Sequence, residues 1–168
     1  MNRARTLAAG LTLSASAFVA ILSSEGYVEV AAIPTKNDRP TNGFGSTFKE
    51  DGTPVRLGER ITPVRAVQRA AIHIGKEEAV YRSSIATVPL YPAEYDLYMD
   101  WTYQYGAGAW SKSSMRRHLQ AGQYRAACNA LLRYKFSGGY DCSTPGNRIC
   151  AGVWDRQLAR HKKCMEAQ

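Results

Sequence analysis

The chain has 168 residues, of which 45% are hydrophobic and 21% are charged, so a single folded domain is expected and a natively disordered chain is excluded. The 22 basic residues outnumber the 14 acidic ones and give a formal net charge of +8. A basic surface favours polyanionic partners such as nucleic acid, anionic lipid or an acidic cell-wall polymer, or it serves solubility alone. Since no run of five or six basic residues is present, we expect no nucleic-acid partner.

An uncharged apolar stretch follows two arginines at the N-terminus. Arg3 and Arg5 precede residues 7–22, LAAGLTLSASAFVAIL, and this pattern is typical of an export signal. The stretch is shorter than the ~20 residues that a comfortable membrane span needs. We interpret residues 1–23 as a signal-anchor segment that tethers an exported protein to the inner membrane and later releases it into the periplasm. The alternatives are a signal peptide cleaved after Ala17 and a buried first helix.

The rest of the chain reads as a β-containing part followed by helices. Residues 23–27 are typical of a helix start or end, and short β-type segments between Pro and Gly predict a twisted hairpin region over residues 28–51. Helices are expected from Thr62–Pro63 to Gly75 and over residues 92–101, 113–119, 123–134 and 153–165, with a break at 105–109 and a loop at 137–149. The pattern predicts an α+β fold in which a cleft separates a small β-hairpin lobe, residues 24–61, from a larger helical lobe, residues 62–168.

Four cysteines lie in the last quarter of the chain, at Cys128, Cys142, Cys150 and Cys164. An even number in one part of an exported protein indicates two disulfides. The preferred pairing joins Cys142 to Cys150 around a Pro/Gly loop and Cys128 to Cys164 between two helices, although the connectivity is not readable from sequence. A zinc site is the alternative, but no C-x2-C pair and no suitably near His is present. We expect no metal and no cofactor.

Glu25, Asp38 and Thr41 are the candidates for chemistry. Cleavage of a glycosidic bond needs a protonated acid on one side of the bond and a carboxylate or an oriented water on the other face of the sugar. Glu25 at the end of an apolar helix suits the first role, because partial desolvation favours the neutral acid. Asp38 with the nearby Thr41 hydroxyl suits the second role.

The segment Glu25-Gly26-Tyr27, followed by Asp38-Arg39-Pro40-Thr41-Asn42-Gly43-Phe44-Gly45-Ser46-Thr47, resembles the active-site segment of the T4-type phage lysozymes. That family places a Glu-Gly dipeptide ahead of a hairpin that ends in Thr-x-Gly-[Phe/Tyr]-Gly. Further resemblance is found in residues 56–63, 103–106 and 138–156, so it covers nearly all of residues 24–168. At the N-terminus the chain is similar to the signal-anchor-release endolysins.

The resemblance implies a lysozyme-like fold and an endolysin that hydrolyses the β-1,4 bond between N-acetylmuramic acid and N-acetylglucosamine of peptidoglycan for host lysis. Glu25 matches the general acid of the family. Thr41 matches the Thr that helps to hold the attacking water, although it follows Glu25 by sixteen residues rather than fifteen. Asp38 departs from the family spacing, because the ninth residue after Glu25 is Pro34. It supplies the second carboxylate from a lengthened hairpin, or it only forms a turn.

Substrate contacts are expected from Gln104, Tyr103 and Gly43. Gln104 stands where the family has a substrate-contacting Asn, and an amide suits an N-acetyl group. The alternative for Gln104 is an ordinary amide at a helix end, and the alternative for the aromatic Tyr103 is a position in the core. Two other functions stay open: a lytic transglycosylase that uses Glu25 alone, and a non-catalytic cell-wall-binding protein. We expect a monomer whose partners are bacterial peptidoglycan and, transiently through residues 7–22, the inner membrane.

The apolar stretch is also expected to control the enzyme. Only Ser23 and Ser24 separate it from Glu25, so lipid around residues 7–22 holds Glu25 at the bilayer surface. An inactive tethered form and an active released form are therefore predicted. No cysteine lies in the stretch, so thiol exchange has no role in this control.

Overall fold

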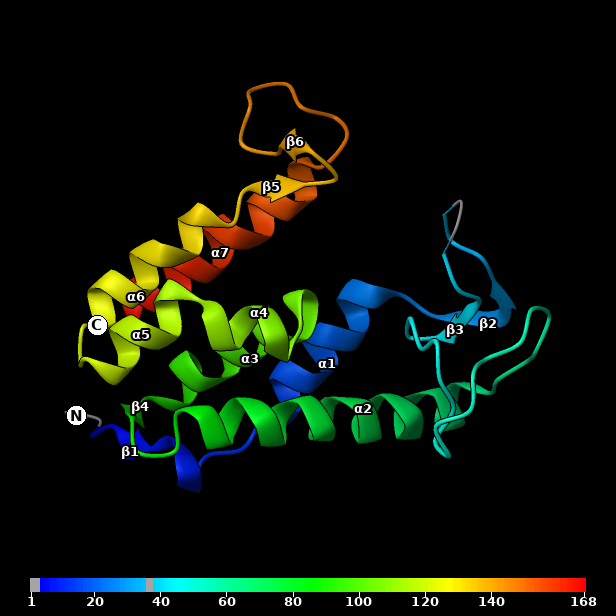
Figure 1. The fold of residues 1–168 in the computed structure, drawn as a ribbon, viewed down its shortest axis with the longest axis horizontal. Coiled ribbons are helices and arrows are strands. Elements are labelled where there is room, and N and C mark those ends of the chain that lie inside the picture. The colour runs from blue at the N-terminus through cyan, green and yellow to red at the C-terminus, as the bar shows by residue number, and fades with distance from the viewer. Residues whose placement is uncertain (1–3, 36–37) are drawn as a thin grey trace. The chain divides into compact units, whose positions relative to one another are not determined.

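The computed structural model describes residues 4–35 and 38–168, and it combines helices with small antiparallel sheets as the sequence predicts (Figure 1). In chain order the elements are β1 (Thr6–Leu7), η1 (Ala8–Gly10), α1 (Ala15–Glu25), β2 (Val28–Ala32), β3 (Thr41–Gly43), α2 (Pro63–Ser84), β4 (Pro89–Leu90), α3 (Pro92–Tyr105), α4 (Ala107–Lys112), α5 (Ser114–Gln120), α6 (Tyr124–Ala130), η2 (Leu131–Arg133), β5 (Phe136–Ser137), β6 (Tyr140–Asp141) and α7 (Ala151–Glu166).

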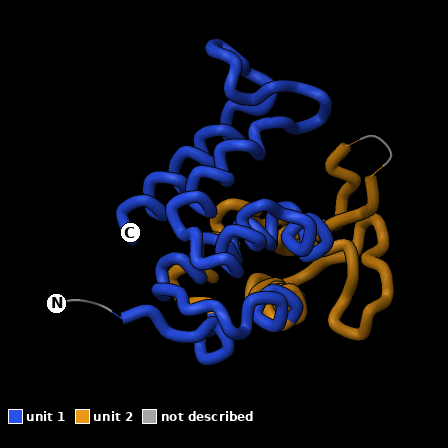
Figure 2. Tube along the Cα trace, turned by 60° about the vertical axis from the view of Figure 1, so that its left-hand side comes forward, with its two compact units in different colours: residues 1–12, 80–168 blue, residues 13–79 orange. Residues whose placement is uncertain are grey.

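The chain divides into two compact units (Figure 2). Unit 2 is residues 13–79, and unit 1 combines residues 1–12 with residues 80–168. Their bounds differ from the expected lobes, because α1 and most of α2 group with the hairpin. The residues before position 13 group with the later helices instead.

Unit 2 is built from α1, the β2–β3 hairpin and the first part of α2. Ser14 caps α1, since its hydroxyl accepts a 3.1 Å hydrogen bond from the backbone N–H of Ala17. The hairpin pairs Val28 with Gly43 and Ala32 with Thr41, and its register shifts between these two pairs. Residues 23–27 therefore contain the end of a helix and the approach to a strand, not the start of a helix.

Helix α2 is longer than the sequence predicts. Gly75 was expected to end it, but the helix continues to Ser84. A glycine inside a helix costs only about 1 kcal/mol relative to alanine. The expectation was wrong because the apolar pattern resumes beyond Gly75, where Tyr81 is fully buried.

Unit 1 packs its helices around a group of large aromatic side chains. Fully buried members are Tyr81, Tyr95, Tyr98, Trp101 and Trp110. The predicted helices over 92–101, 113–119 and 153–165 are present as α3, α5 and α7, with bounds that differ by one to four residues. The predicted helix over 123–134 is α6 followed by η2. The sequence missed α4, which begins at Ala107 inside the predicted break, because Gly106, with a φ of 85°, turns the chain for one residue only.

The N-terminal stretch is part of both units. Residues 6–7 form β1, which pairs with β4 at Thr6 and Leu90, and Ala8 is fully buried beside it. The second half of the stretch is helical and makes up most of α1. None of the described helices combines the length and the apolar composition that crossing a membrane requires.

Both disulfides have the preferred pairing. Cys128 is bonded to Cys164, and Cys142 to Cys150. The first bond joins α6 to α7, which run side by side in Figure 1. The second closes the loop between β6 and α7. A chain cross-linked in this way loses less conformational entropy on folding.

Candidate active site

Glu25 is the last residue of α1, and the turn after β3 brings backbone close to its carboxylate. Gly26 ends the helix with a φ of 71°, in the left-handed region that favours glycine. Gly45, with a φ of 74°, is so near that an added Cβ atom would lie 3.3 Å from Oε2 of Glu25. The Glu25 side chain is thus exposed at a helix end and bordered by the turn of residues 42–46.

Asn42 anchors this turn within unit 2. Its backbone exchanges two hydrogen bonds with Ser46, of 3.2 and 3.0 Å. Its buried side chain accepts a 2.8 Å hydrogen bond from Nη1 of Arg69 and donates one of 3.0 Å to the carbonyl of Glu59. Because both polar ends of a buried amide are satisfied, the turn has one well-defined position against α2.

Arg69 is a buried cation beneath the turn, with an exposed fraction of only 2%. Its Nη2 atom lies 3.3 Å from Oε2 of Glu50, which also pairs with Arg65 at 3.1 Å. Hydrogen bonding to its own backbone, together with Arg65 and Arg69, holds the pKa of Glu50 below its usual range. The carboxylate therefore stays ionised and compensates the buried guanidinium group.

The next residues of the turn are held by close packing. Gly43 has a φ of 62°, and an added Cβ atom would lie 3.0 Å from Cβ of Ala66 on α2. The Phe44 ring packs against Tyr27 with 5.7 Å between ring centroids. The Tyr27 hydroxyl donates a 2.6 Å hydrogen bond to the carbonyl of Ile61. Hydrogen bonds at Asn42 and close packing at Gly43 and Phe44 therefore hold the turn in place.

Thr41 and Asp38 lie at increasing distance along the chain from this turn. Thr41 is half-buried in β3, whereas Asp38 is exposed in the loop beyond the paired strands. Oδ1 of Asp38 accepts a 2.8 Å hydrogen bond from the backbone N–H of Arg39, and Oδ2 accepts one of 3.3 Å from the Thr35 hydroxyl. These contacts are those of the turn-forming role that the sequence left open.

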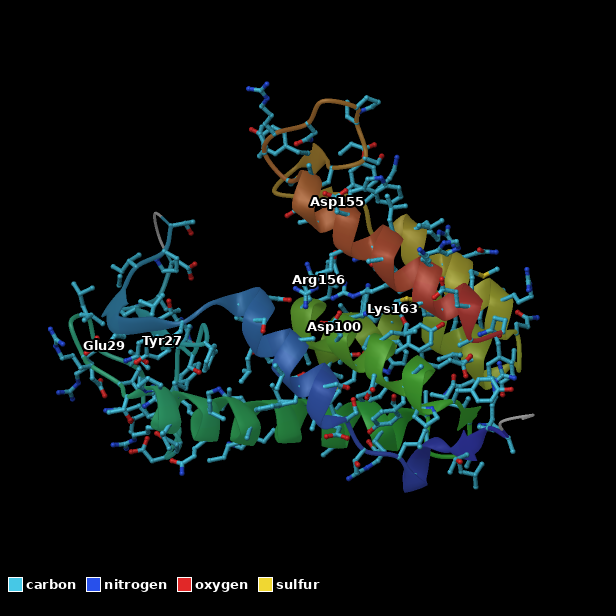
Figure 3. All side chains as sticks on the ribbon, turned by 180° about the vertical axis from the view of Figure 1, so that it is seen from behind. Tyr27, Glu29, Asp100, Asp155, Arg156 and Lys163 are labelled. Carbon is cyan, nitrogen blue, oxygen red and sulfur yellow. A yellow bond between two sulfur atoms is a disulfide. The ribbon has the colours of Figure 1, made fainter. Side chains whose placement is uncertain are left out.

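In unit 1, a charged network lies between α3 and α7. Nε of Arg160 donates a 2.6 Å hydrogen bond to Asp100, which also pairs with Arg156, and Figure 3 shows the Asp100 and Arg156 side chains directed toward each other. Burial acts to raise the pKa of Asp100, but Arg160 and Arg156 outweigh it and hold this pKa below its usual range. Burial lowers the pKa of Arg160, which is only 3% exposed.

This network orients Gln104, the predicted substrate contact. Oε1 of Gln104 accepts a 2.7 Å hydrogen bond from Nη1 of Arg160. A guanidinium group has only donors, so the amide must present its oxygen to Arg160 and direct its NH₂ group elsewhere. Within the described residues this NH₂ group donates no hydrogen bond, and the half-buried side chain is a ready donor. Tyr103, the preceding residue, is likewise half-buried.

The sequence profile of the phage lysozyme family matches residues 23–159. The chain belongs to this family. An endolysin of Salmonella phage P22 is 33% identical to it over 100 residues, which are 59% of this chain and 67% of the relative.

Solved structures agree with this assignment. A mutant of P22 lysozyme superposes with a TM-score of 0.74 at 24% identity, covering 92% of this chain and 99% of the other. An endolysin from the Escherichia coli O157:H7 phage FAHEc1 gives a TM-score of 0.76 at 24% identity, with coverages of 95% and 96%. The active form of the P1 phage endolysin gives 0.70 at 16% identity, with coverages of 98% and 97%. The predicted lysozyme-like α+β fold is confirmed.

The sequence missed two arginines, one in each unit, that hold candidate site residues. Arg69 holds Asn42, and Arg160 holds Gln104. Arg69 stands between Ala66 and Ala70 on the buried face of α2. An arginine at such a position is a signal of a buried partner. The partner itself is not readable from the local pattern.

Alanine substitutions at the two turn glycines, Gly43 and Gly45, are predicted to have different effects on stability and on kcat. Gly43→Ala lowers the free energy of unfolding by about 2–4 kcal/mol, because strain at positive φ adds to overlap with Ala66. Gly45→Ala costs about 1–2 kcal/mol of stability. It also lowers kcat at least about tenfold, because the new methyl group displaces the Glu25 carboxylate. Chemical denaturation and wall-clearing assays measure both effects.

Gly52→Ala is the matched control. Gly52 has a φ of 83°, and an added Cβ atom meets nothing within 4 Å. It therefore carries the backbone strain without the contact, and its kcat should equal that of the wild type. Equal kcat values for Gly45→Ala and Gly52→Ala would contradict the assigned role of Gly45.

Proposed function

We propose that this phage lysozyme is an endolysin that hydrolyses the β-1,4 bond between N-acetylmuramic acid and N-acetylglucosamine, with Glu25 as general acid. The observation that carries the proposal is the closeness of the turn to the Glu25 carboxylate, since a Cβ atom added at Gly45 would lie only 3.3 Å from Oε2 of Glu25. Family membership supports hydrolysis as the reaction.

In this mechanism Glu25 donates its proton to the glycosidic oxygen as the bond to the anomeric carbon breaks. Positive charge develops on the sugar ring, and a water attacks the opposite face with inversion. The water leaves its hydroxyl group on the anomeric carbon and releases its other proton to the solvent, from which Glu25 takes up a proton to regain its acid form. Thr41 holds that water through its hydroxyl. In unit 1, the NH₂ group of Gln104 donates to the carbonyl oxygen of an N-acetyl group and Tyr103 contacts a sugar. In unit 2, the backbone at Gly43 contacts a sugar.

Replacement of the acid tests the mechanism directly. Glu25→Gln keeps the size of the side chain but removes the transferable proton, so kcat falls by about 10³-fold or more while binding to cell walls is retained. Turbidity clearing and pelleting with purified peptidoglycan measure the two quantities. Persistent lysis by Glu25→Gln would contradict the enzymatic role, and loss of binding together with lysis would point to misfolding.

A second pair of variants distinguishes the catalytic roles of Asp38 and Thr41. The hydrogen bonds of Asp38 favour a turn role, and Asn forms the same turn, so Asp38→Asn should keep kcat within about threefold. Thr41→Ala should lower kcat by about 10²-fold, because the attacking water loses its partner. A drop of about 10³-fold for Asp38→Asn would instead make Asp38 the catalytic base.

Product analysis accompanies these variants. Hydrolysis leaves a reducing sugar end, whereas a lytic transglycosylase leaves a 1,6-anhydro end. We expect reducing ends from the wild-type enzyme. Anhydro ends together with an inert Asp38 would favour the transglycosylase.

We also propose that residues 1–23 are exported and retained in the active enzyme, first as a weak inner-membrane tether and then as part of the periplasmic fold. The support is electrostatic. Glu94 is fully buried, and its two oxygens accept hydrogen bonds of 3.1 and 3.2 Å from Arg5. Cleavage after Ala17 would remove this cation and leave a buried carboxylate without its ion pair, which costs about 3–5 kcal/mol.

The same stretch links tethering to inactivity. Residues 15–22 make up most of α1, whose last residue is Glu25. While these residues lie in lipid, α1 cannot take its place in unit 2 and Gly45 cannot border the Glu25 carboxylate. The many Gly, Ala, Ser and Thr residues of the stretch keep its insertion free energy small, so release is feasible when the membrane depolarises.

Two measurements test retention of the N-terminus. Arg5→Ala should lower the free energy of unfolding by about 3 kcal/mol. The control Arg60→Ala should cost less than about 1 kcal/mol, because it removes an exposed pair with Glu29. N-terminal sequencing of the exported enzyme should find a start before Arg5. A mature start after Ala17 would contradict the proposal.

A further inference from the structure

One side chain of α2 holds both ends of the segment that contains the turn at the site. The Arg69 guanidinium group donates a 2.8 Å hydrogen bond from Nη1 to Oδ1 of Asn42, and its Nη2 atom lies 3.3 Å from Oε2 of Glu50. Asn42 begins the turn, whereas Glu50 follows it in the chain. A guanidinium group suits this bridging position, because its donors are arranged in a rigid fork.

Stability alone does not account for an arginine at this position. Only 2% of Arg69 is exposed, and its buried Nε atom has no hydrogen-bond partner among the described residues. Removing a guanidinium group from water and leaving one of its donors unsatisfied both cost free energy. When apolar side chains of similar volume replace a buried charged group and its partner, the protein is often equally stable or more stable. Stability by itself would therefore favour an apolar residue at position 69.

The contacts of Asn42 connect the buried arginine to the proposed acid. The backbone of Asn42 exchanges two hydrogen bonds with Ser46, and Gly45 lies within the turn that these bonds close. A Cβ atom added at Gly45 would lie 3.3 Å from Oε2 of Glu25. One side-chain hydrogen bond and one closed turn thus separate the Arg69 guanidinium group from the surroundings of the Glu25 carboxylate.

We propose that Arg69 is a positioning residue for the general acid, and that it serves the rate of the reaction and not the stability of the fold. This inference rests on the proposed function of Glu25. The effect of Arg69 on the acid passes through Asn42 and the turn of residues 42–46. A misplacement of about 1 Å at a reacting group can cost on the order of 10²-fold in rate. Loss of the Arg69–Asn42 hydrogen bond therefore lowers kcat, while KM changes little because Gln104 on α3 is unaffected.

The decisive variant replaces the polar pair by an apolar pair. In Asn42→Leu with Arg69→Met both partners of the hydrogen bond are removed together, and Glu50 keeps its pair with Arg65. We expect a Tm within about 5 °C of the wild type, or above it. We also expect kcat to fall at least about tenfold and KM to change less than about twofold. Thermal unfolding gives the Tm, and kinetics on peptidoglycan are measured at a temperature at which every variant is folded.

Single variants test whether the two side chains act through one contact. Arg69→Met and Asn42→Leu should each lower kcat as much as the double variant does, because each breaks the same hydrogen bond. Asn42→Asp keeps an acceptor for Arg69 and should recover most of the kcat that Asn42→Leu loses. The matched control is Arg65→Met, which should keep the kcat of the wild type. Arg65 pairs with the same Glu50 at 3.1 Å, but among the described residues it forms no hydrogen bond to the turn of residues 42–46.

Three results would overturn the proposal. A Tm of the double variant more than about 10 °C below the wild type would show that Arg69 serves stability. A wild-type kcat in the double variant would show that Arg69 does not position the acid. An equal loss of kcat in Arg65→Met would show that any change near Glu50 has the same effect. The proposed function is tested separately by Glu25→Gln, since persistent lysis by that variant contradicts the acid whatever the Arg69 variants do.

Discussion

The hydrogen bond between Asn42 and the buried Arg69 is the contact on which the arrangement of unit 2 depends. It holds the turn of residues 42–46 against α2, where Gly43 is already in contact with Ala66. With the turn held there, Gly45 reaches the Glu25 carboxylate at the end of α1. The position of the proposed acid therefore follows from packing on a helix that does not itself contain a catalytic group. Glycine is required at two places in this turn, because any Cβ atom would occupy the space that brings the elements together.

A second constraint concerns the N-terminal stretch, which has two incompatible environments. Its apolar composition suits lipid, and its residues 15–22 are also the body of α1. Arg5 favours the folded environment, because it satisfies a carboxylate that is otherwise buried without a cation. In our proposal, one segment determines both where the enzyme is held and whether its acid is in place. On this view release from the membrane and completion of the site are the same conformational event.

The two units also differ in net charge. Unit 2 has no net charge and carries the proposed acid, while unit 1 carries the whole excess of positive charge. The charge of Arg160 is compensated within unit 1, since Arg160 pairs with Asp100 and also fixes the direction of the Gln104 amide.

Local patterns in the sequence determined much of this protein. Breakers and helical spacing located the hairpin and most helices, the cysteine spacing indicated both disulfides, and Glu25-Gly26 with the turn motif indicated a lysozyme. Each of these signals lies within a few residues of the feature it predicts. Only the tertiary structure decided the rest. Helix α2 passes through Gly75, Asp38 is engaged by its own loop, and Arg69 meets a residue 27 positions away in the chain. Such outcomes depend on which side chains share a buried space, and a single sequence does not specify that for residues far apart along the chain.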